Sequence, residues 1–280
     1  MTGTRPSRLG EETNQLMKVV IFCGGLGVRM GEETTRIPKP MITVGGRPIL
    51  WHIMKWYASW GYDDFVLCLG YKGECIKDYF LNYNEAMSND FVLSNGGRDV
   101  ELSRRDISTW RIAFVDTGAH ATIAERLLAV ASHLGDDDYF LATYGDGLTD
   151  APLPDMIERL RSSGKTGLFI LVRPMFNAHV IAADEDGLVR SVEDMQHANV
   201  WINGGFMVLR RDILDQINPG EELVIEPFAR LIEQGELLAY RYDGFWEPMD
   251  TMKDKQRLDA LAETGNPPWR RAASDSTVVR

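Results

Sequence analysis

Cysteine is scarce in this sequence of 280 residues, and basic side chains are outnumbered by acidic ones. The three cysteines, Cys23, Cys68 and Cys75, are odd in number and form no Cys-x-x-Cys pair, which favours buried thiols in a reducing cytoplasm over a disulfide framework. Lys and Arg total 30 against 41 Asp and Glu, giving a formal net charge of -11. This balance disfavours broad contact with nucleic acid or an anionic membrane, but it allows a few cations to converge on a small anionic ligand.

Long apolar runs are also missing, and no signal-peptide pattern opens the chain. The sequence therefore predicts a soluble, cytoplasmic protein that does not associate with membranes. Residues 1–16 are polar and aperiodic and are expected to form a disordered leader. Residues 265–280 contain Asn-Pro-Pro and a Ser/Thr-rich end, and we expect a loose tail there. A single domain over residues 17–264 is the simplest organisation.

Between these ends, short β-rich runs alternate with helical patterns. The predicted strands are 18–23, 64–69, 111–115, 139–143 and 201–209, and the predicted helices are 48–60, 73–84 and 123–134. A hairpin is predicted at 179–192, around an Asp-Glu-Asp-Gly turn. This order predicts an α/β fold of the Rossmann-like type, with an open, mixed but mostly parallel sheet flanked by helices. The less regular second half is expected to contribute a smaller mixed portion.

A glycine-rich segment, Gly24 to Arg29, directly follows the first predicted strand. Glycines let a backbone approach phosphate closely and direct N–H groups towards it. The segment lacks the third glycine of the dinucleotide fingerprint and the Gly-Lys-Ser/Thr of a Walker motif, so taken alone it could be a structural turn. Arg29 ends it, and Lys39 follows between Pro38 and Pro40, which should make this stretch stiff and extended. These two cations favour a polyphosphate-binding function over a bare turn.

Two aspartates are candidate metal ligands. Asp146 lies between glycines at the end of a predicted strand, and Asp250 lies in Met-Asp-Thr just before a predicted helix. Mg²⁺ typically takes one or two protein carboxylates and completes its shell with water and substrate phosphates. The alternative for each aspartate is a turn or helix N-cap, and Asp250 in particular is well placed to cap the helix near Met252.

Taken together, these motifs resemble the sugar-phosphate nucleotidyltransferases, and among them the glucose-1-phosphate cytidylyltransferases. The resemblance covers roughly residues 17 to 260. It is densest in Lys39 to Lys55 and Gly70 to Gly73, and it returns in four further segments, Val115 to Gly118, Thr143 to Gly147, Ile202 to Gly205 and Gly244 to Thr251. It implies the nucleotide-diphospho-sugar transferase type of fold, with the smaller mixed portion binding the acceptor. It also implies transfer of a nucleotidyl group, CMP from CTP being favoured, to a sugar 1-phosphate or similar acceptor with release of pyrophosphate. Homo-oligomers are expected because relatives form them.

Carried over by position, the resemblance assigns Arg29 and Lys39 to neutralising the phosphates as the catalytic pair. It implies that Asp146 and Asp250 hold a Mg²⁺ ion. The implied nucleotide-binding residues are Phe22, Cys23, Gly24, Gly25, Leu26, Gly27, Val28, Arg126 and Gly145. The candidate acceptor-binding residues are Glu193, Asn203, Gly204 and, in a segment that departs from the family, His179.

The departures concern the acceptor side. The family's Ser/Gly-rich loop after Asp-Thr-Gly is replaced here by Ala121 to Glu125, its Phe-Gly by Asn177 to His179, and its Glu-Lys-Pro by Glu193-Asp194-Met195. Loss of that lysine removes a charge that meets the sugar phosphate, so a different hexose phosphate, a cyclitol phosphate or a phosphonate remains open as acceptor. Two further alternatives are a metal-dependent glycosyltransferase and a non-catalytic sugar-nucleotide-binding protein.

Overall fold

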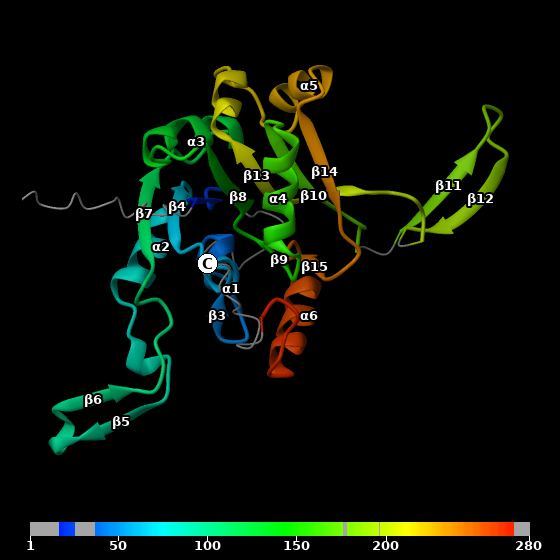
Figure 1. Cartoon of the computed structure of the whole chain (residues 1–280). Coiled ribbons are helices and arrows are strands. Elements are labelled where there is room, and N and C mark those ends of the chain that lie inside the picture. The colour runs from blue at the N-terminus through cyan, green and yellow to red at the C-terminus, as the bar shows by residue number, and fades with distance from the viewer. Residues whose placement is uncertain (1–16, 26–36, 176–177, 196, 272–280) are drawn as a thin grey trace, which may run out of the picture.

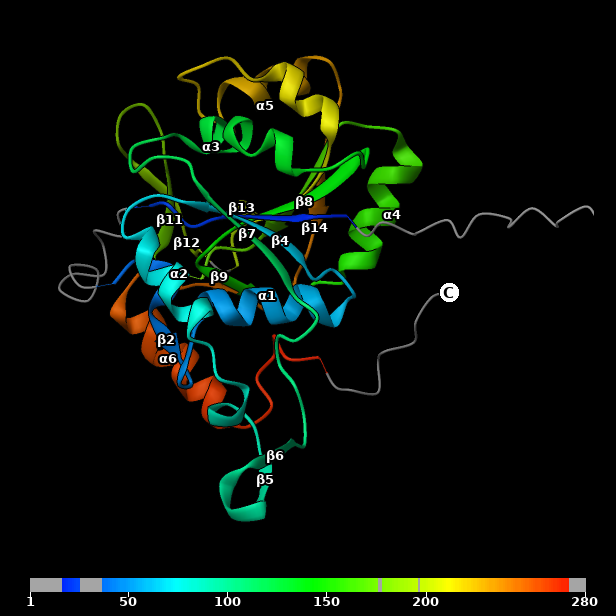
Figure 2. The ribbon, with the colours of Figure 1, turned by 90° about the vertical axis from the view of Figure 1, so that its left-hand side faces the viewer.

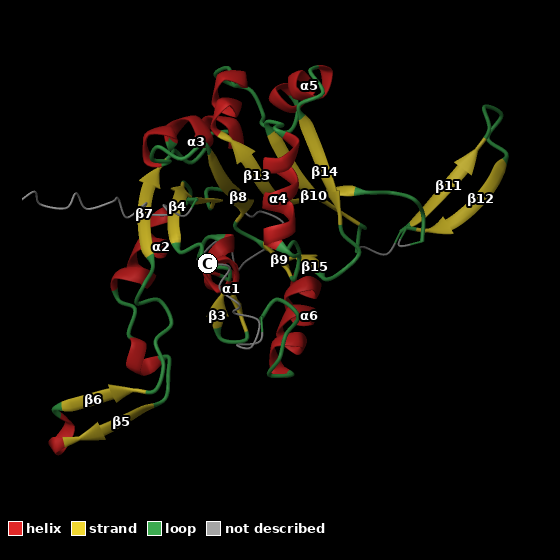
Figure 3. Cartoon of the chain, viewed as in Figure 1, coloured by secondary structure: helices red, strands yellow, loops and turns green. Residues whose placement is uncertain are grey.

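A computed structural model describes residues 17–25, 37–175, 178–195 and 197–271, and the statements below concern these residues (Figures 1 and 3). The strands are β1 (Val19–Phe22), β2 (Thr43–Val44), β3 (Arg47–Pro48), β4 (Asp64–Leu69), β5 (Phe91–Ser94), β6 (Asp99–Leu102), β7 (Arg111–Asp116), β8 (Tyr139–Tyr144), β9 (Gly147–Thr149), β10 (Gly167–Val172), β11 (His179–Ala183), β12 (Val189–Asp194), β13 (Ile202–Arg210), β14 (Leu237–Arg241) and β15 (Trp246–Pro248). The α-helices are α1 (Ile49–Ser59), α2 (Gly73–Leu81), α3 (Ile123–Ala129), α4 (Leu153–Ser163), α5 (Glu226–Glu233) and α6 (Met252–Glu263). Short 3₁₀ helices are η2 (Lys39–Met41), η3 (Glu85–Met87), η4 (Asn95–Gly97), η5 (Ala131–His133) and η6 (Arg211–Gln216).

A seven-stranded sheet in the order β14-β10-β13-β8-β1-β4-β7 forms the centre of the molecule (Figure 1). The neighbours β8, β1, β4 and β7 are parallel, as are β10 and β14. Strand β13 runs antiparallel to both β8 and β10, so β10 and β14 point the same way as β8. The parallel strands therefore end at one common edge, where open α/β sheets bind their ligands.

Helices cover both faces of this sheet, with α1 on one side and α3 and α5 on the other (Figure 2). Strand β1 shows how the sequence supplies both interfaces, because successive side chains point to opposite faces. Val19 and Ile21 join the core packed by α1 and α4, whereas Val20 and Phe22 join the core packed by α3 and α5. Burial on both faces explains why this strand is apolar throughout instead of alternating.

Two hairpins extend away from the body, β5–β6 on one side and β11–β12 on the other (Figure 1). Their apolar side chains are largely exposed: Val92 and Ile181 are each 59% exposed. The β11–β12 hairpin was predicted from its turn motif, whereas β5–β6 was not predicted. No described helix combines the length and the apolar character needed to cross a bilayer.

The predicted fold class, a mostly parallel sheet flanked by helices, is confirmed. The packed core reaches Trp269, which is 3% exposed and donates its indole N–H to Nδ1 of His52 at 3.3 Å. This residue lies in the segment expected to be a loose tail. The stretch around Lys39, expected to be extended, forms the 3₁₀ helix η2 after an extended Pro38. The predicted boundaries of leader, domain and tail remain predictions.

Candidate active site

The two aspartates meet because of a short antiparallel pairing at the edge of the sheet. Asp146 directly precedes β9, Asp250 follows β15 with only Met249 between them, and the register pairs Gly147 with Pro248. Antiparallel pairing places the start of one strand beside the end of the other. A backbone hydrogen bond from Met249 N–H to the Asp146 carbonyl, at 2.8 Å, continues the pairing to the aspartates themselves. Residues more than a hundred positions apart thereby share one site.

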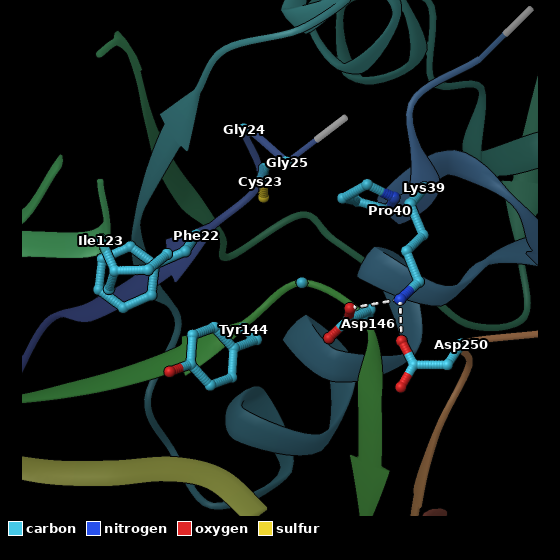
Figure 4. A pocket seen from close by; sticks show the side chains of 11 residues that line it. Phe22, Cys23, Gly24, Gly25, Lys39, Pro40, Ile123, Tyr144, Asp146 and Asp250 are labelled. Atoms are coloured by element: carbon cyan, nitrogen blue, oxygen red, sulfur yellow. Dashed lines mark hydrogen bonds and ion pairs between the residues drawn. The ribbon is translucent and has the colours of Figure 1, made fainter. Parts of the chain in front are cut away.

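Lys39 lies between the two carboxylates (Figure 4). Its Nζ is 2.7 Å from Oδ2 of Asp146 and 2.6 Å from Oδ1 of Asp250. Burial by itself lowers the pKa of Lys39, but the charge and hydrogen bond of Asp146, followed by those of Asp250, outweigh it and raise the pKa above its usual value. The lysine is therefore a permanent cation. The alternative prediction, that Asp250 is the N-cap of the following helix, is excluded, because Thr251 caps α6 in a capping box with Asp254.

The glycine segment after β1 forms another wall of the site. Gly24 lies against Arg126, and a Cβ at position 24 would stand 2.0 Å from Nη1 of that arginine. Arg126 is 3% exposed and donates to the carbonyls of Gly24 and Leu69, both at 3.2 Å, and to Thr117 Oγ1 at 2.7 Å. The guanidinium thus fixes the backbone of the loop from behind. Its predicted function in nucleotide binding stays a prediction.

These groups surround a cavity of about 290 Å³. Its lining residues are Phe22, Cys23, Gly24, Gly25, Lys39, Pro40, Ile123, Tyr144, Gly145, Asp146 and Asp250. Figure 4 shows that the cavity has two different ends. Phe22, Ile123 and Tyr144 form an apolar end, and the lysine with its two aspartates forms a charged end, with the glycine segment between them.

Sequence reasoning missed three of the lining residues, Pro40, Ile123 and Tyr144. Tyr144 ends β8 immediately before Gly145, so its position beside the predicted Gly-Asp-Gly motif was the available signal. Gly205 makes room for this ring: its φ is +82°, and a Cβ there would stand 2.4 Å from Cδ2 of Tyr144. Burial, followed by the charges of Glu222 and Asp146, raises the pKa of Tyr144 to about 12, so the phenol remains neutral.

Covalent catalysis by the thiol in this cavity is disfavoured. Cys23 is 1% exposed, and burial raises the pKa of its thiol well above the ordinary value. A thiol held neutral is a weak nucleophile. The chemically active groups of the cavity are therefore its charged side chains, one ammonium and two carboxylates, which together leave one negative charge for a further cation to balance.

The charged end also fits a divalent metal ion. Among the residues described, no cluster of three or more His, Cys, Asp or Glu side chains is arranged to hold a metal. Asp146 and Asp250 nevertheless share one cation, the Lys39 ammonium, so their oxygens converge on a single position. Two carboxylates with the remaining ligands supplied by phosphates and water are the usual requirement of Mg²⁺.

The candidate acceptor residues fall into two groups. His179 and Glu193 lie at the base of the projecting β11–β12 hairpin, where they pair with Asp194 and Val180 respectively. Asn203 and Gly204 lie in the central sheet on β13. The Asn203 side chain accepts the Gly205 N–H at 2.8 Å, and the Gly204 carbonyl accepts the Trp246 indole N–H at 2.7 Å. None of the four lines the cavity described above. Their functions stay predictions.

The remaining site residues expected from the sequence, Leu26, Gly27, Val28 and Arg29, lie outside the described residues. Phe22, Cys23, Gly24, Gly25 and Gly145 line the cavity, as their predicted function in nucleotide binding requires. Gly145 packs closely there, since a Cβ would stand 3.1 Å from both the Phe22 carbonyl oxygen and Cγ of Pro40.

Comparisons with known proteins place this geometry in context. A family model described as nucleotidyl transferase matches residues 18–253. The chain is 42% identical over 258 residues to the glucose-1-phosphate cytidylyltransferase of Salmonella typhimurium, covering 91% of this chain and 99% of that protein. A protein of the same name from Salmonella typhi matches to the same extent. Among solved structures, the UTP-bound UGPase of Acinetobacter baumannii is similar in fold, with a TM-score of 0.67 at 17% identity, over 91% of this chain and 95% of that chain.

Proposed function

The chain belongs to the nucleotidyl transferase family, and from this premise we propose that it transfers CMP from CTP to a sugar 1-phosphate or similar phosphorylated acceptor and releases pyrophosphate. The observation that carries the proposal is the bridge from Lys39 to Asp146 and Asp250 beside a glycine-walled cavity. A cation and two carboxylates able to hold a metal ion, beside a glycine segment that leaves room for phosphates, form a site suited to a metal-bound polyphosphate.

The two ends of the cavity support one orientation of the nucleotide. Phe22, Ile123 and Tyr144 offer apolar and aromatic surface to a base, whereas phosphates require the charged end. The glycine segment between the two ends has no side chain at Gly24 or Gly25 that would obstruct the ribose and phosphates of the nucleotide. The α-phosphorus would then lie near Lys39, within reach of an acceptor arriving from the carboxyl edge of the sheet.

The proposed chemistry is an in-line displacement. An oxygen of the acceptor phosphate attacks the α-phosphorus, a new P–O bond forms, and the bond to the bridging oxygen of pyrophosphate breaks. A phosphate monoester is already mostly dianionic near neutral pH, with a second pKa of about 6, so no general base is required. Lys39 would neutralise charge on the phosphates, and its raised pKa keeps it protonated for that task.

Enzymes of this family generally depend on a divalent metal ion, and we propose Mg²⁺ here. Asp146 and Asp250 would hold it, and the ion would stabilise charge on the transferring and leaving phosphates. An ammonium group and a divalent cation compete for the same two carboxylates. We therefore expect Lys39 to exchange these partners for phosphate oxygens when the metal–nucleotide complex binds.

The preference for CTP rests on the relatives that are 42% identical over nearly the whole chain and are named for cytidylyl transfer. The acceptor is proposed only as a phosphorylated sugar or sugar-like molecule. Asp194 and Met195 occupy the positions of the Lys-Pro pair in the family that the sequence resembles, and they cannot supply the positive charge that this lysine gives to the sugar phosphate. A homo-oligomer is proposed as well, and the exposed apolar side chains of the two hairpins are consistent with it.

The deciding experiment is pyrophosphate release measured for CTP, UTP, dTTP, GTP and ATP against a panel of phosphorylated acceptors. Fast release with CTP and one acceptor, dependent on Mg²⁺, supports the proposal. Transfer from a nucleoside diphosphate sugar without pyrophosphate formation would instead indicate a glycosyltransferase. Binding of CTP or a sugar nucleotide, seen as a thermal shift, with no turnover of any acceptor would indicate a non-catalytic binding protein.

A further inference from the structure

A second cavity, of about 370 Å³, lies apart from the active site and shares no lining residue with it. It is formed by one face of α1, the segment after η3, the loop before β7 and the segment after α6. Its lining residues are Trp51, His52, Lys55, Trp56, Ser59, Asn89, Arg104, Arg105, Asp106, Trp269, Arg270 and Arg271. Five of these carry permanent positive charge and one carries negative charge, in a chain whose net charge is -11.

The single carboxylate, that of Asp106, does not neutralise the positive charge of this second cavity, which is called the basic cavity below. Asp106 already pairs with other groups. Oδ2 of Asp106 accepts from Arg47 Nη2 at 3.1 Å, from the Tyr83 hydroxyl at 3.0 Å and from Asn89 Nδ2 at 3.2 Å. Its Oδ1 is 3.8 Å from Lys55 Nζ. Arg47 lies outside the lining of the cavity and takes much of this charge. The basic cavity therefore keeps a net positive charge.

The cavity is also rich in donors that lack acceptors. Arg104 and Arg105 are exposed, and neither makes an ion pair or side-chain hydrogen bond with any residue of the described segments. His52 is neutral at physiological pH, because burial, opposed by its bond to the Val44 carbonyl, lowers its pKa to about 4. A concave surface of this kind matches a ligand made mainly of acceptor oxygens.

We propose that the basic cavity is a second anion site, which binds the diphosphate or triphosphate group of a small molecule separately from the active site. Its volume is suited to a ligand of that size. Arg104 and Arg105 would contact the phosphates, since each presents a planar fork of donors suited to phosphate oxygens. Inorganic pyrophosphate and a nucleoside diphosphate share this chemistry, so the test includes both.

The test is calorimetric titration of the full chain with pyrophosphate, with CDP and with cytidine, in wild type and in a Lys39→Met background that weakens anion binding at the active site. We expect a class of sites for pyrophosphate and CDP that survives Lys39→Met, and no such class for cytidine. Arg104→Ser/Arg105→Ser should weaken that class by at least about tenfold, since bonds to charged groups are worth more than one decade of affinity. The exposed pair Lys77→Ser/Arg98→Ser removes the same charge elsewhere and should leave binding unchanged.

The proposal fails if Lys39→Met eliminates all pyrophosphate binding, if the Arg104/Arg105 variant binds like its control, or if cytidine binds as tightly as CDP. Turnover of CTP, measured in parallel, keeps this result apart from the proposed function, because neither arginine belongs to the active site. Circular dichroism of the variant confirms its fold. Arg270→Ser provides a second perturbation of the same cavity from a different segment and should weaken binding in the same direction.

Discussion

Replacing Lys39 by methionine tests the central feature of the active site, because it removes one charge and leaves two carboxylates facing each other. The lysine side chain is 12% exposed, while those of Asp146 and Asp250 are 32% and 38% exposed. Removing one partner of a buried ion pair costs about 3–5 kcal/mol, and of a surface pair about 0–1 kcal/mol. This partly solvated bridge lies between, at about 2 kcal/mol, or roughly 4–8 °C in Tm for a domain of this size.

Magnesium should reverse this loss in the variant. With the ammonium gone, the divalent ion becomes the counter-charge of the two carboxylates and no longer competes with Lys39. At tenfold its dissociation constant, an ion that binds only the folded state contributes roughly 1.4 kcal/mol. We therefore expect Mg²⁺ to raise the Tm of Lys39→Met by several degrees more than that of wild type. Turnover should fall about 10²–10³-fold, as for loss of one preorganised electrostatic donor elsewhere.

Differential scanning fluorimetry with and without Mg²⁺, followed by pyrophosphate release, checks both expectations. The matched control is Lys255→Met, because Lys255 is 2.7 Å from a single carboxylate, Asp259, on α6 and is also largely buried. The Lys255→Met variant should lose only about 0.3–0.5 kcal/mol of folding free energy, which is typical of an ion pair within a helix. Its Tm should show no extra response to Mg²⁺, and its turnover should be that of wild type. Equal Mg²⁺ shifts in the two variants, or wild-type turnover in Lys39→Met, would refute the shared-cation interpretation of the site.

Three further perturbations follow from the structure. Asp250→Asn should lower turnover by about 10²–10³-fold and raise the Mg²⁺ concentration needed for half-maximal rate, and an unchanged Mg²⁺ dependence would remove this residue from the metal site. His52→Gln should flatten the acid side of the stability curve, because the folded pKa of about 4 lies below the unfolded value of about 6.5. The stability that His52 contributes is thus complete above pH 6.5 and is lost as the pH falls towards 4, by about 2–4 kcal/mol, which urea unfolding at several pH values measures. Gly205→Ala should push the Tyr144 ring into the cavity and raise the KM for CTP by about tenfold or more, whereas an unchanged KM would show that this ring does not border the nucleotide.

Much of the architecture could be predicted from local patterns, because apolar runs of strand length and helical periodicity are set by burial. Strand β4 and helix α1 lie where the pattern indicated. The β5–β6 hairpin was missed because such patterns are present only where side chains are buried. Its residues are almost all exposed, so burial imposes no pattern on Phe91 to Leu102. The other hairpin, β11–β12, could be predicted because its turn carries a recognisable motif, which begins at Asp184 and ends in a glycine.

The site was predicted only as separate motifs. Gly-Asp-Gly and Met-Asp-Thr are local, but nothing local indicates that β9 pairs with β15, and this pairing brings Asp146 to Asp250. Long-range register depends on the tertiary packing of both strands, which spacing in the sequence does not encode. Only the resemblance to a known family predicted that the two aspartates lie together. Ile123, the first residue of α3, had no signal of its own, because an apolar residue at a helix start is usually core.

The Lys39 bridge also explains how two carboxylates can lie side by side in the folded chain. Two carboxylates brought together by strand pairing repel each other, and a folded chain tolerates them only with a counter-charge at hand. Lys39 supplies it from a segment 107 residues away from Asp146, held between Pro38 and Pro40 in a short 3₁₀ helix. The prolines reduce the backbone entropy that is lost when this segment is fixed on folding. In the proposed reaction the same ammonium would lie beside the nucleotide phosphates, so the group that stabilises the pair of aspartates would also be the one that neutralises phosphate charge.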